Sequence, residues 1–144
     1  MNNMPNDETA RAWARLVRVE QALMSKIEAE LKEAGLPPLA WYDVLLELAR
    51  DETVALRPIE LEKHLLLAQH NVSRLIDRLE RVGLVVRQAC PDDGRGQLVA
   101  ITAKGRKLRL RMWRVYGRAI ATHVGSRLAR DDANELARIL ALLV

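Results

Sequence analysis

The sequence has 144 residues, of which 49% are hydrophobic and 3% are aromatic, with one Cys and no Phe. This length predicts a single domain, and one cysteine excludes an internal disulfide and fits a reducing cytoplasm. No apolar run approaches about 18 residues and no signal-peptide pattern is present, so we expect a cytoplasmic protein without a membrane partner. The cysteine and the three histidines lack the spacing of zinc ligands, so the sequence predicts no metal or cofactor.

The positive charge is concentrated in the second half of the chain. The net charge is +4 and the isoelectric point is near 9.6. Between Arg57 and Arg111 there are twelve basic and six acidic residues, whereas the remainder holds eleven basic and thirteen acidic residues. This asymmetry is typical of a phosphate-binding surface, although a basic face alone is more often simply solvated.

The first half of the chain has the periodicity of helices. Apolar residues at steps of three and four predict one helix over residues 7–34 and a second over residues 39–50. Between them, Gly35 and the two following prolines end the first helix. Pro58 suits the first turn of a third helix, where its missing N–H needs no partner.

The stretch from Gln69 to Val82 predicts a helix with one buried stripe, formed by Val72, Leu75, Ile76, Leu79 and Val82. Gly83 follows where a helix commonly needs a left-handed residue. The opposite face is polar and carries side chains that can bond base edges and phosphates. These are Gln69, His70, Asn71, Ser73, Arg74, Asp77, Arg78 and Arg81.

Two β-prone runs, residues 84–90 and 97–101, surround a turn-forming segment at residues 91–96. Arg95 lies between glycines at the tip, and Asp93 is placed to pair with it and orient it. A short helix, a polar-faced helix and a basic hairpin in this order predict a winged helix-turn-helix, which suits a DNA major groove with an adjacent minor groove. The alternative is an ordinary surface helix and hairpin with solvated charges.

The C-terminal part predicts two further helices. Thr102 is a natural N-cap for a long helix that runs to about Leu128, and a last helix is expected over residues 131–143. The last helix carries more apolar surface than a solvated terminus should show. The fold class predicted from the whole chain is therefore mainly α with a small β-hairpin wing.

The sequence resembles the MarR (multiple antibiotic resistance regulator) family over about residues 36–105. The matching segments are 41–45, 56–61, 71–80, 83–85, 92–96 and 101–105. One departure is Ala68, where the family usually has a Ser or Thr that caps the recognition helix. The absence of that cap should cost about 1 kcal/mol.

The resemblance implies a single domain over residues 1–144. Residues 7–34 and 103–144 would form dimerisation helices, and residues 39–102 would form the DNA-binding lobe. A homodimer would bind a pseudo-palindromic operator in double-stranded DNA, most commonly as a repressor. The alternative is a monomer whose last helix folds back on its own core.

The pattern and the resemblance together predict the DNA-binding residues. Residues at the start of the recognition helix are candidates for base and phosphate contacts: Gln69, His70, Asn71, Ser73 and Arg74. His70 is equally well interpreted as a spectator. Arg78 has two interpretations, phosphate binding or, as in the family, an intramolecular salt bridge. Arg95 is expected to enter a minor groove.

The resemblance also implies a pocket for a small aromatic or anionic effector that releases DNA. Its candidate residues are the aromatic side chains Trp13, Trp41, Tyr42, Trp113 and Tyr116. The alternative is that these residues only pack the core and the dimer. Cys90 is expected to pack at the end of a wing strand and not to sense oxidants.

The sequence offers less support for other classes of function. The sequence contains no arrangement typical of nucleophilic catalysis and no Gly-rich phosphate loop, so we do not expect an enzyme. A winged-helix module that binds proteins is disfavoured by Arg74 and Arg95. A weakly specific architectural DNA-binding protein remains an alternative, distinguishable by its ratio of specific to non-specific affinity.

Overall fold

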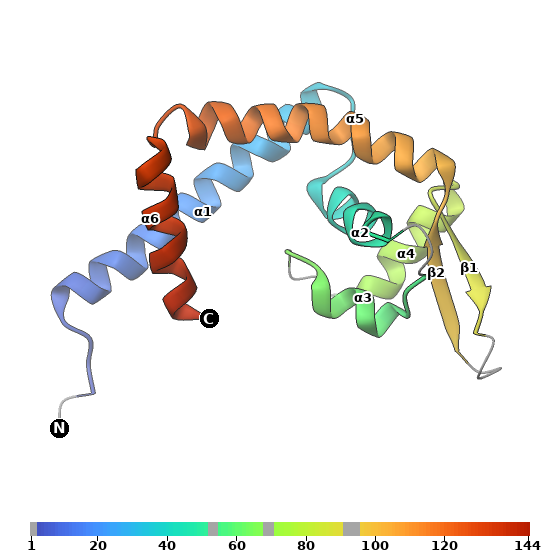
Figure 1. The fold of residues 1–144 in the computed structure, drawn as a ribbon, viewed down its shortest axis with the longest axis horizontal. Coiled ribbons are helices and arrows are strands. Elements are labelled where there is room, and N and C mark those ends of the chain that lie inside the picture. The colour runs from blue at the N-terminus through green and yellow to red at the C-terminus, as the bar shows by residue number, and fades with distance from the viewer. Residues whose placement is uncertain (1–2, 52–54, 68–70, 91–95) are drawn as a thin grey trace.

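The computed structural model of the chain describes residues 3–51, 55–67, 71–90 and 96–144. Two long helices, α1 (Asp7–Glu33) and α5 (Ala103–Ile120), form one side of the molecule. Figure 1 shows α5 running along the top, from the hairpin at one end to the C-terminal part of α1 at the other. α1 begins at Asp7 because the Asn6 Oδ1 accepts a hydrogen bond from the Thr9 N–H at 2.8 Å, which satisfies an N–H group of the first turn.

A small lobe lies below one half of α5 (Figure 1). We call it the winged lobe, and it consists of α2 (Leu39–Ala49), α3 (Pro58–His64), α4 (Val72–Arg81), β1 (Val85–Ala89) and β2 (Gln97–Ile101). The strands pair antiparallel, from Val85 opposite Ile101 to Ala89 opposite Gln97. The predicted fold class, mainly helical with a β-hairpin wing, is confirmed.

The winged lobe has its own apolar core, which we call the winged core. Four residues of the predicted stripe on α4 form one side of it, because Val72, Leu75, Ile76 and Leu79 are all buried. The fifth, Val82, is 41% exposed, because the helix ends there. The other members come from α2, α3, both strands and the turn after α4: Val44, Leu45, Leu48, Leu61, Leu84, Val85 and Val99. The exposed face of α4 is therefore the polar one.

A second apolar cluster, which we call the helical core, joins α1, α2 and α5. Its buried members are Ile27, Leu31, Leu39, Tyr42, Met112 and Ala119. α2 contributes to both cores, since alternate parts of its surface face α5 and the wing. It is the helix through which the winged lobe is attached to the long helices.

Three predicted boundaries differ from the structure. The polar-faced helix begins at Val72 and not near Gln69, because Asn71 has an extended backbone and caps the helix. The long helix ends as a regular α-helix at Ile120 and continues in a π-helical turn, Ala121–Gly125. The last helix, α6, covers Arg130–Leu140, and a 3₁₀ turn completes the chain up to Leu143.

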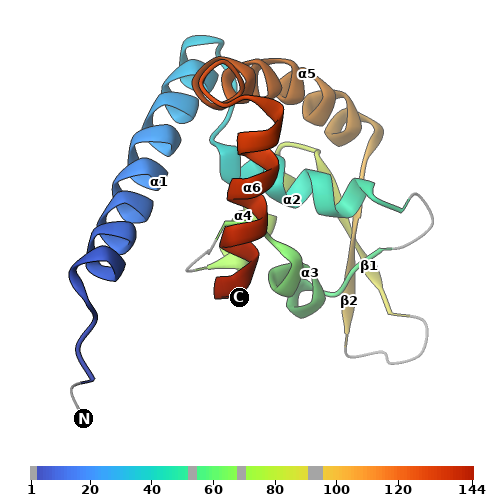
Figure 2. The ribbon, with the colours of Figure 1, turned by 60° about the vertical axis from the view of Figure 1, so that its left-hand side comes forward.

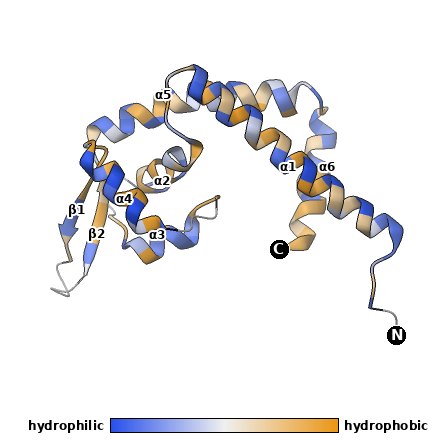
Figure 3. Cartoon of the chain, turned by 180° about the vertical axis from the view of Figure 1, so that it is seen from behind, coloured by the Kyte–Doolittle hydropathy of each residue, from blue (hydrophilic) through white to orange (hydrophobic). Residues whose placement is uncertain are grey.

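α1 and α6 descend from α5 as two separate arms (Figure 2). No residue of α6 is buried, and the side chains of Leu136 and Ile139 are both 44% exposed. Figure 3 shows hydrophobic segments along α6 and in the turn that follows it. Trp13, near the start of α1, is 67% exposed. In the part of the chain that the structure describes, no helix is long and apolar enough to span a bilayer.

Candidate nucleic-acid interface

The N-terminal end of α4 is fixed by Asn71. Its side-chain oxygen accepts a hydrogen bond from the Arg74 N–H at 3.0 Å. This cap replaces the one that the sequence lacks at Ala68, because the helix starts three residues later than that position requires. The Asn71 oxygen thus has a structural partner within the chain, and its amide nitrogen is the group left for an external contact.

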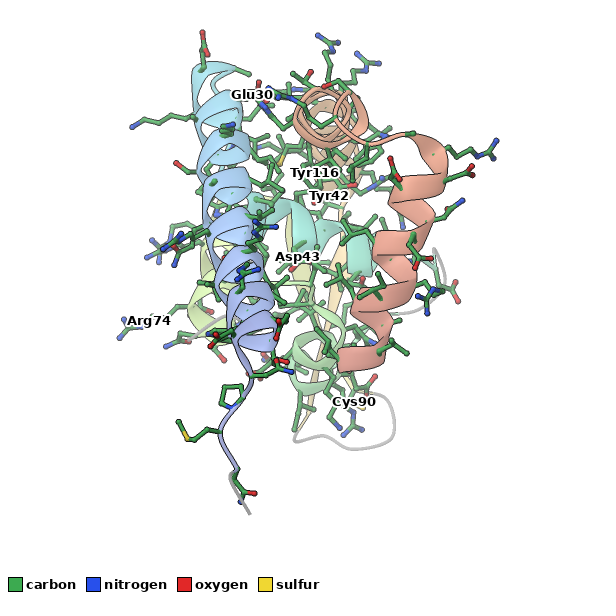
Figure 4. The ribbon with its side chains drawn as sticks, turned by 90° about the vertical axis from the view of Figure 1, so that its left-hand side faces the viewer. Glu30, Tyr42, Asp43, Arg74, Cys90 and Tyr116 are labelled. Carbon is green, nitrogen blue, oxygen red and sulfur yellow. The ribbon has the colours of Figure 1, made fainter. Side chains whose placement is uncertain are left out.

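The outward face of α4 carries Ser73, Arg74, Asp77 and Arg78, all of which are exposed. Figure 4 shows the Arg74 side chain extending away from the molecule. The exposed ends of these side chains lie on the first two turns of the helix, on the face opposite the winged core. This is the arrangement in which a helix can present polar groups to a groove.

An ion pair connects α4 to the wing. The Arg87 guanidinium, on β1, lies 2.5 Å from Asp77 Oδ1 and 3.3 Å from Glu80 Oε1. The Arg87 N–H also donates to Glu80 Oε2 at 3.1 Å. Arg87 therefore pairs with both carboxylates of α4 and offsets part of their negative charge, and the three arginines of the helix leave this surface with a net positive charge.

The C-terminal end of α4 is held by the start of α5. Gly83 has a φ of 80°, as its predicted left-handed role requires. The Lys104 Nζ donates to the Val82 carbonyl and the Thr102 Oγ1 donates to the Gly83 carbonyl, both at 2.7 Å. Thr102 also caps α5, as predicted, by accepting the Gly105 N–H at 3.0 Å. The orientations of α4 and α5 are therefore coupled.

Several predicted site residues lie outside the described residues: Gln69, His70, Asp93 and Arg95. The intramolecular interpretation of Arg78 finds no support in the described part of the chain, where the ion pair to α4 comes from Arg87 instead. Arg78 is exposed, which leaves it available to a phosphate.

Three of the five candidate aromatic residues come together between α2 and α5. The Tyr42 ring lies 5.2 Å from the Tyr116 ring and 6.1 Å from the Trp113 ring, measured between centroids. All three line a cavity of ≈ 480 Å³ together with Asp43, Leu66, Leu67 and Ile120, among others. Figure 4 shows Tyr116, Tyr42 and Asp43 in the middle of the molecule, between α5 and the winged lobe.

The other two candidate aromatic residues do not line this cavity. Trp13 is exposed on α1, and Trp41 packs against the winged core. The sequence assigns each aromatic residue to a helix but does not give the direction of its side chain, so it groups all five around one pocket. The Trp41 side chain points in a different direction from that of Tyr42, because adjacent side chains of a helix point about 100° apart.

Burial raises the pKa of the Tyr42 hydroxyl above the ordinary value of 10.0, and a hydrogen bond from Arg109 offsets only part of this rise. Burial also raises the pKa of Tyr116. The Arg109 Nε is itself buried without a hydrogen-bond partner among the described residues. Asp43, Glu47 and Arg50 also line the cavity, so its wall combines neutral phenols with charged groups of both signs.

We expect the stability of the fold to decrease as the pH rises above 10.0. The unfolded chain then loses tyrosine protons that the folded chain retains, and this difference favours unfolding. The measurement is the free energy of unfolding across this range, with tyrosinate absorbance recorded in parallel. The double variant Tyr42→Phe, Tyr116→Phe should lose this component, since the chain has no other tyrosine. Ionisation of both tyrosines at the same pH in the folded and unfolded chain would contradict the prediction.

Cys90 is buried at the end of the hairpin, as the packing interpretation expects. Its Sγ accepts a hydrogen bond from the Arg57 guanidinium at 3.5 Å. Figure 4 shows it far from the tyrosines, at the opposite end of the winged lobe.

Sequence reasoning missed three residues that shape the interface: Asp43, Arg87 and Lys104. Arg87 and Lys104 act on partners in other elements, which no local periodicity reveals. Asp43 did leave a signal, because it is a carboxylate inside the apolar run Trp41-Tyr42-Asp43-Val44-Leu45. A charge in such a run is buried and needs hydrogen-bond partners.

These features define a winged helix-turn-helix protein whose polar-faced helix is exposed and whose lobe is carried by long terminal helices. The sequence model of the MarR family matches residues 34–96. MarR-family structures also align with nearly the whole chain. The resemblance to the MarR family of transcriptional regulators found in the sequence is therefore confirmed.

Two similar structures come from Streptomyces coelicolor. The MarR-family transcriptional regulator Sco3205, solved in complex with DNA, has 26% identity and a TM-score of 0.87, covering 98% of this chain and 89% of its own. The regulator AbsC has 25% identity and a TM-score of 0.85, covering 99% and 95%. The organohalide-sensing regulator RdhR, bound to 2,4-dichlorophenol, shares the fold with 20% identity and a TM-score of 0.80, covering 99% and 86%.

Proposed function

We propose that this protein is a sequence-specific DNA-binding regulator that acts as a homodimer in the bacterial cytoplasm. The observation that carries the proposal is the exposed polar face of α4, with Arg74 extended outward and both acidic residues of the helix paired with Arg87. The helix offers hydrogen-bond donors, and its three arginines outnumber its two carboxylates, so its net charge attracts phosphates. The complex of Sco3205 with DNA supports the same use of the fold.

The residue roles follow from position. Ser73 and Arg74 occupy the first turn of α4 and would contact bases and nearby phosphates, together with Gln69, His70 and the free amide group of Asn71. Arg78, one turn further along, would bind a phosphate. Arg95, which lies between β1 and β2 in the sequence, would enter the minor groove next to the site, with Asp93 orienting it.

The homodimer is supported by the exposed apolar surface of the terminal helices. The last turns of the chain expose Leu142 and Leu143 as well as the stripe on α6, and no element of the described chain buries them. A second copy of the chain would bury this surface. Two winged lobes related by a two-fold axis would then read a pseudo-palindromic operator.

We propose further that DNA binding represses transcription and that a small aromatic or anionic molecule releases the DNA. The cavity lined by Tyr42, Trp113 and Tyr116 supports this, since aromatic walls near Arg109 suit a planar, acidic molecule. Such a ligand would favour a dimer whose α4 helices are wrongly spaced for DNA. The phenol bound by RdhR is a ligand of this chemical type.

The experiment that tests the function is selection of bound fragments from a genomic DNA pool, followed by affinity measurements on the selected sequence. We expect specific binding at least about a thousandfold tighter than binding to unrelated duplex. Addition of small aromatic acids should then release the DNA. A ratio near one would favour the architectural alternative, and absence of duplex binding at low salt would overturn the proposal.

Arg74→Ala and Arg95→Ala should both weaken binding, but in different ways. We expect Arg95→Ala to weaken binding to all sequences and to reduce the slope of log affinity against log salt by about one unit. Arg74→Ala should cost about 1–3 kcal/mol of specificity if it reads a base. Arg114→Ala, which removes an exposed arginine of α5, is the matched control. Unchanged affinity and salt slope in Arg95→Ala would exclude the minor-groove role.

A further inference from the structure

Asp43 is a buried carboxylate, with 5% of its surface exposed. Both of its oxygens accept backbone hydrogen bonds from the turn that follows α3. The Leu66 N–H donates to Oδ1 at 3.0 Å and the Leu67 N–H donates to Oδ2 at 2.7 Å. Among the described residues neither N–H has a backbone acceptor. Asp43 thus satisfies two consecutive donors that the turn would otherwise leave unpaired.

The turn that Asp43 holds connects the two cores. Leu65 packs against the winged core, whereas Leu67 packs against the helical core. The backbone between these two side chains is the part bound by Asp43. A shift of the turn would therefore move one of the two leucines out of its core, so the hydrogen bonds and the packing fix the same position.

The turn also lies directly upstream of the DNA-reading helix. α3 ends at His64 and α4 begins at Val72, so Leu66 and Leu67 belong to the short connection between the two helices. Only residues 68–71 separate Leu67 from α4, so the placement of Leu67 limits where the N-terminal end of α4 can lie. That end carries Ser73 and Arg74, for which displacements of about 1 Å matter to directional hydrogen bonds.

We propose that Asp43 is a positioning residue for DNA recognition: its carboxylate holds the α3–α4 turn and thereby the height and angle of α4. This inference rests on the proposed function, because it assigns the placement of the reading helix to one side chain. Asp43, Leu66 and Leu67 also line the cavity beside Tyr42 and Tyr116. A molecule that fills the cavity would therefore contact the same three residues that form these hydrogen bonds.

The chemistry requires a carboxylate and not only a polar side chain. Asn at this position has one oxygen, which can accept one N–H, and an NH₂ group that would face the second N–H donor. Asp43→Asn therefore keeps the shape of the side chain and disrupts half of the interaction. Glu47→Gln is the matched control, since Glu47 lies one turn further along α2, lines the same cavity and pairs with Arg50 instead of the turn.

The test compares wild type, Asp43→Asn and Glu47→Gln by hydrogen exchange and by DNA affinity. Exchange is followed for the Leu66 and Leu67 amides, the first turn of α4 and the buried strand β2. We expect Asp43→Asn to speed exchange at the turn and at the start of α4 while β2 stays protected. Its affinity for the selected operator should fall about tenfold with an unchanged salt slope, because every phosphate-binding cation is still present.

The outcomes separate this inference from the proposed function. If Asp43→Asn is less stable to heat but binds the operator with wild-type affinity well below its melting temperature, the positioning role is overturned and Asp43 is only a stabilising residue. Unchanged exchange at Leu66 and Leu67 overturns it as well. A similar loss of DNA affinity in Glu47→Gln would show that the loss comes from removing a negative charge from the cavity and not from releasing the turn. Failure of the wild type to bind duplex overturns the proposed function, whatever the exchange data show.

Discussion

Gly105→Ala is expected to destabilise the folded protein by about 3 kcal/mol. A Cβ at this position would lie 2.2 Å from the Leu84 carbonyl oxygen and 2.8 Å from Cγ1 of Ile101. The first of these atoms is backbone and cannot rotate away. It also accepts the Thr102 N–H at 3.0 Å, so moving it would disturb the junction between the wing and α5.

The measurement is equilibrium unfolding by denaturant at fixed protein concentration, since association would shift the apparent stability. Gly125→Ala is the matched control, because its Cβ would meet only the Ile120 carbonyl oxygen at 3.9 Å, an ordinary contact. It should be neutral or slightly stabilising, as the alanine restricts the unfolded chain. An unfolding midpoint of Gly105→Ala equal to that of the wild type would show that the junction of β1, β2 and α5 tolerates the extra methyl.

Ile139→Glu should convert the dimer into monomers and thereby remove operator binding. Ile139 belongs to the exposed apolar stripe of α6 with Leu136 and Leu140. In a dimer that buries this stripe, the new carboxylate would be buried without a partner, at a cost of about 3 kcal/mol or more. This corresponds to a dissociation constant raised about a hundredfold or more. A monomer has a single winged lobe and therefore retains only half of the contacts to the operator.

Sedimentation equilibrium and DNA affinity measure the two effects separately. Asn134→Glu introduces the same charge on the opposite face of α6, where every residue is also exposed, and should leave the dimer intact. A stable dimer of Ile139→Glu would place the subunit contact elsewhere, and a monomeric wild type would overturn the homodimer itself. In either case the Gly105 prediction is unaffected, because it concerns contacts within one chain.

Several local features of the fold were predictable because their causes are adjacent in the sequence. The stripe on α4, the left-handed Gly83, the Thr102 cap of α5 and Pro58 at the start of α3 all depend on residues within one or two helical turns. The outward direction of Arg74 follows from the same periodicity. The residues at positions 71–74 could thus be assigned to the exposed end of the helix before the structure was known.

The predictions that the structure corrects are those in which two sequence signals competed, or in which the interacting residue is distant along the chain. Gln69 and His70 extended the polar pattern, but the Asn71 side chain ends it by capping the helix at Val72. The π-helical turn after Ile120 has no sequence signal comparable to a proline. The five aromatic residues were grouped by helix, and the structure divides them because the rotation of each helix about its axis is set by packing.

The sequence by itself determined the order of the elements, the buried face of α4 and the basic character of the second half of the chain. These properties depend on composition and spacing, which do not change on folding. Tertiary structure alone decided that Arg87 pairs with the acidic residues of α4, that Tyr42, Trp113 and Tyr116 meet around one cavity, and that Asp43 holds the turn before the reading helix. Each of these contacts joins elements that are separate along the chain, and only the packing of α2 between α5 and the wing brings the last two sets together.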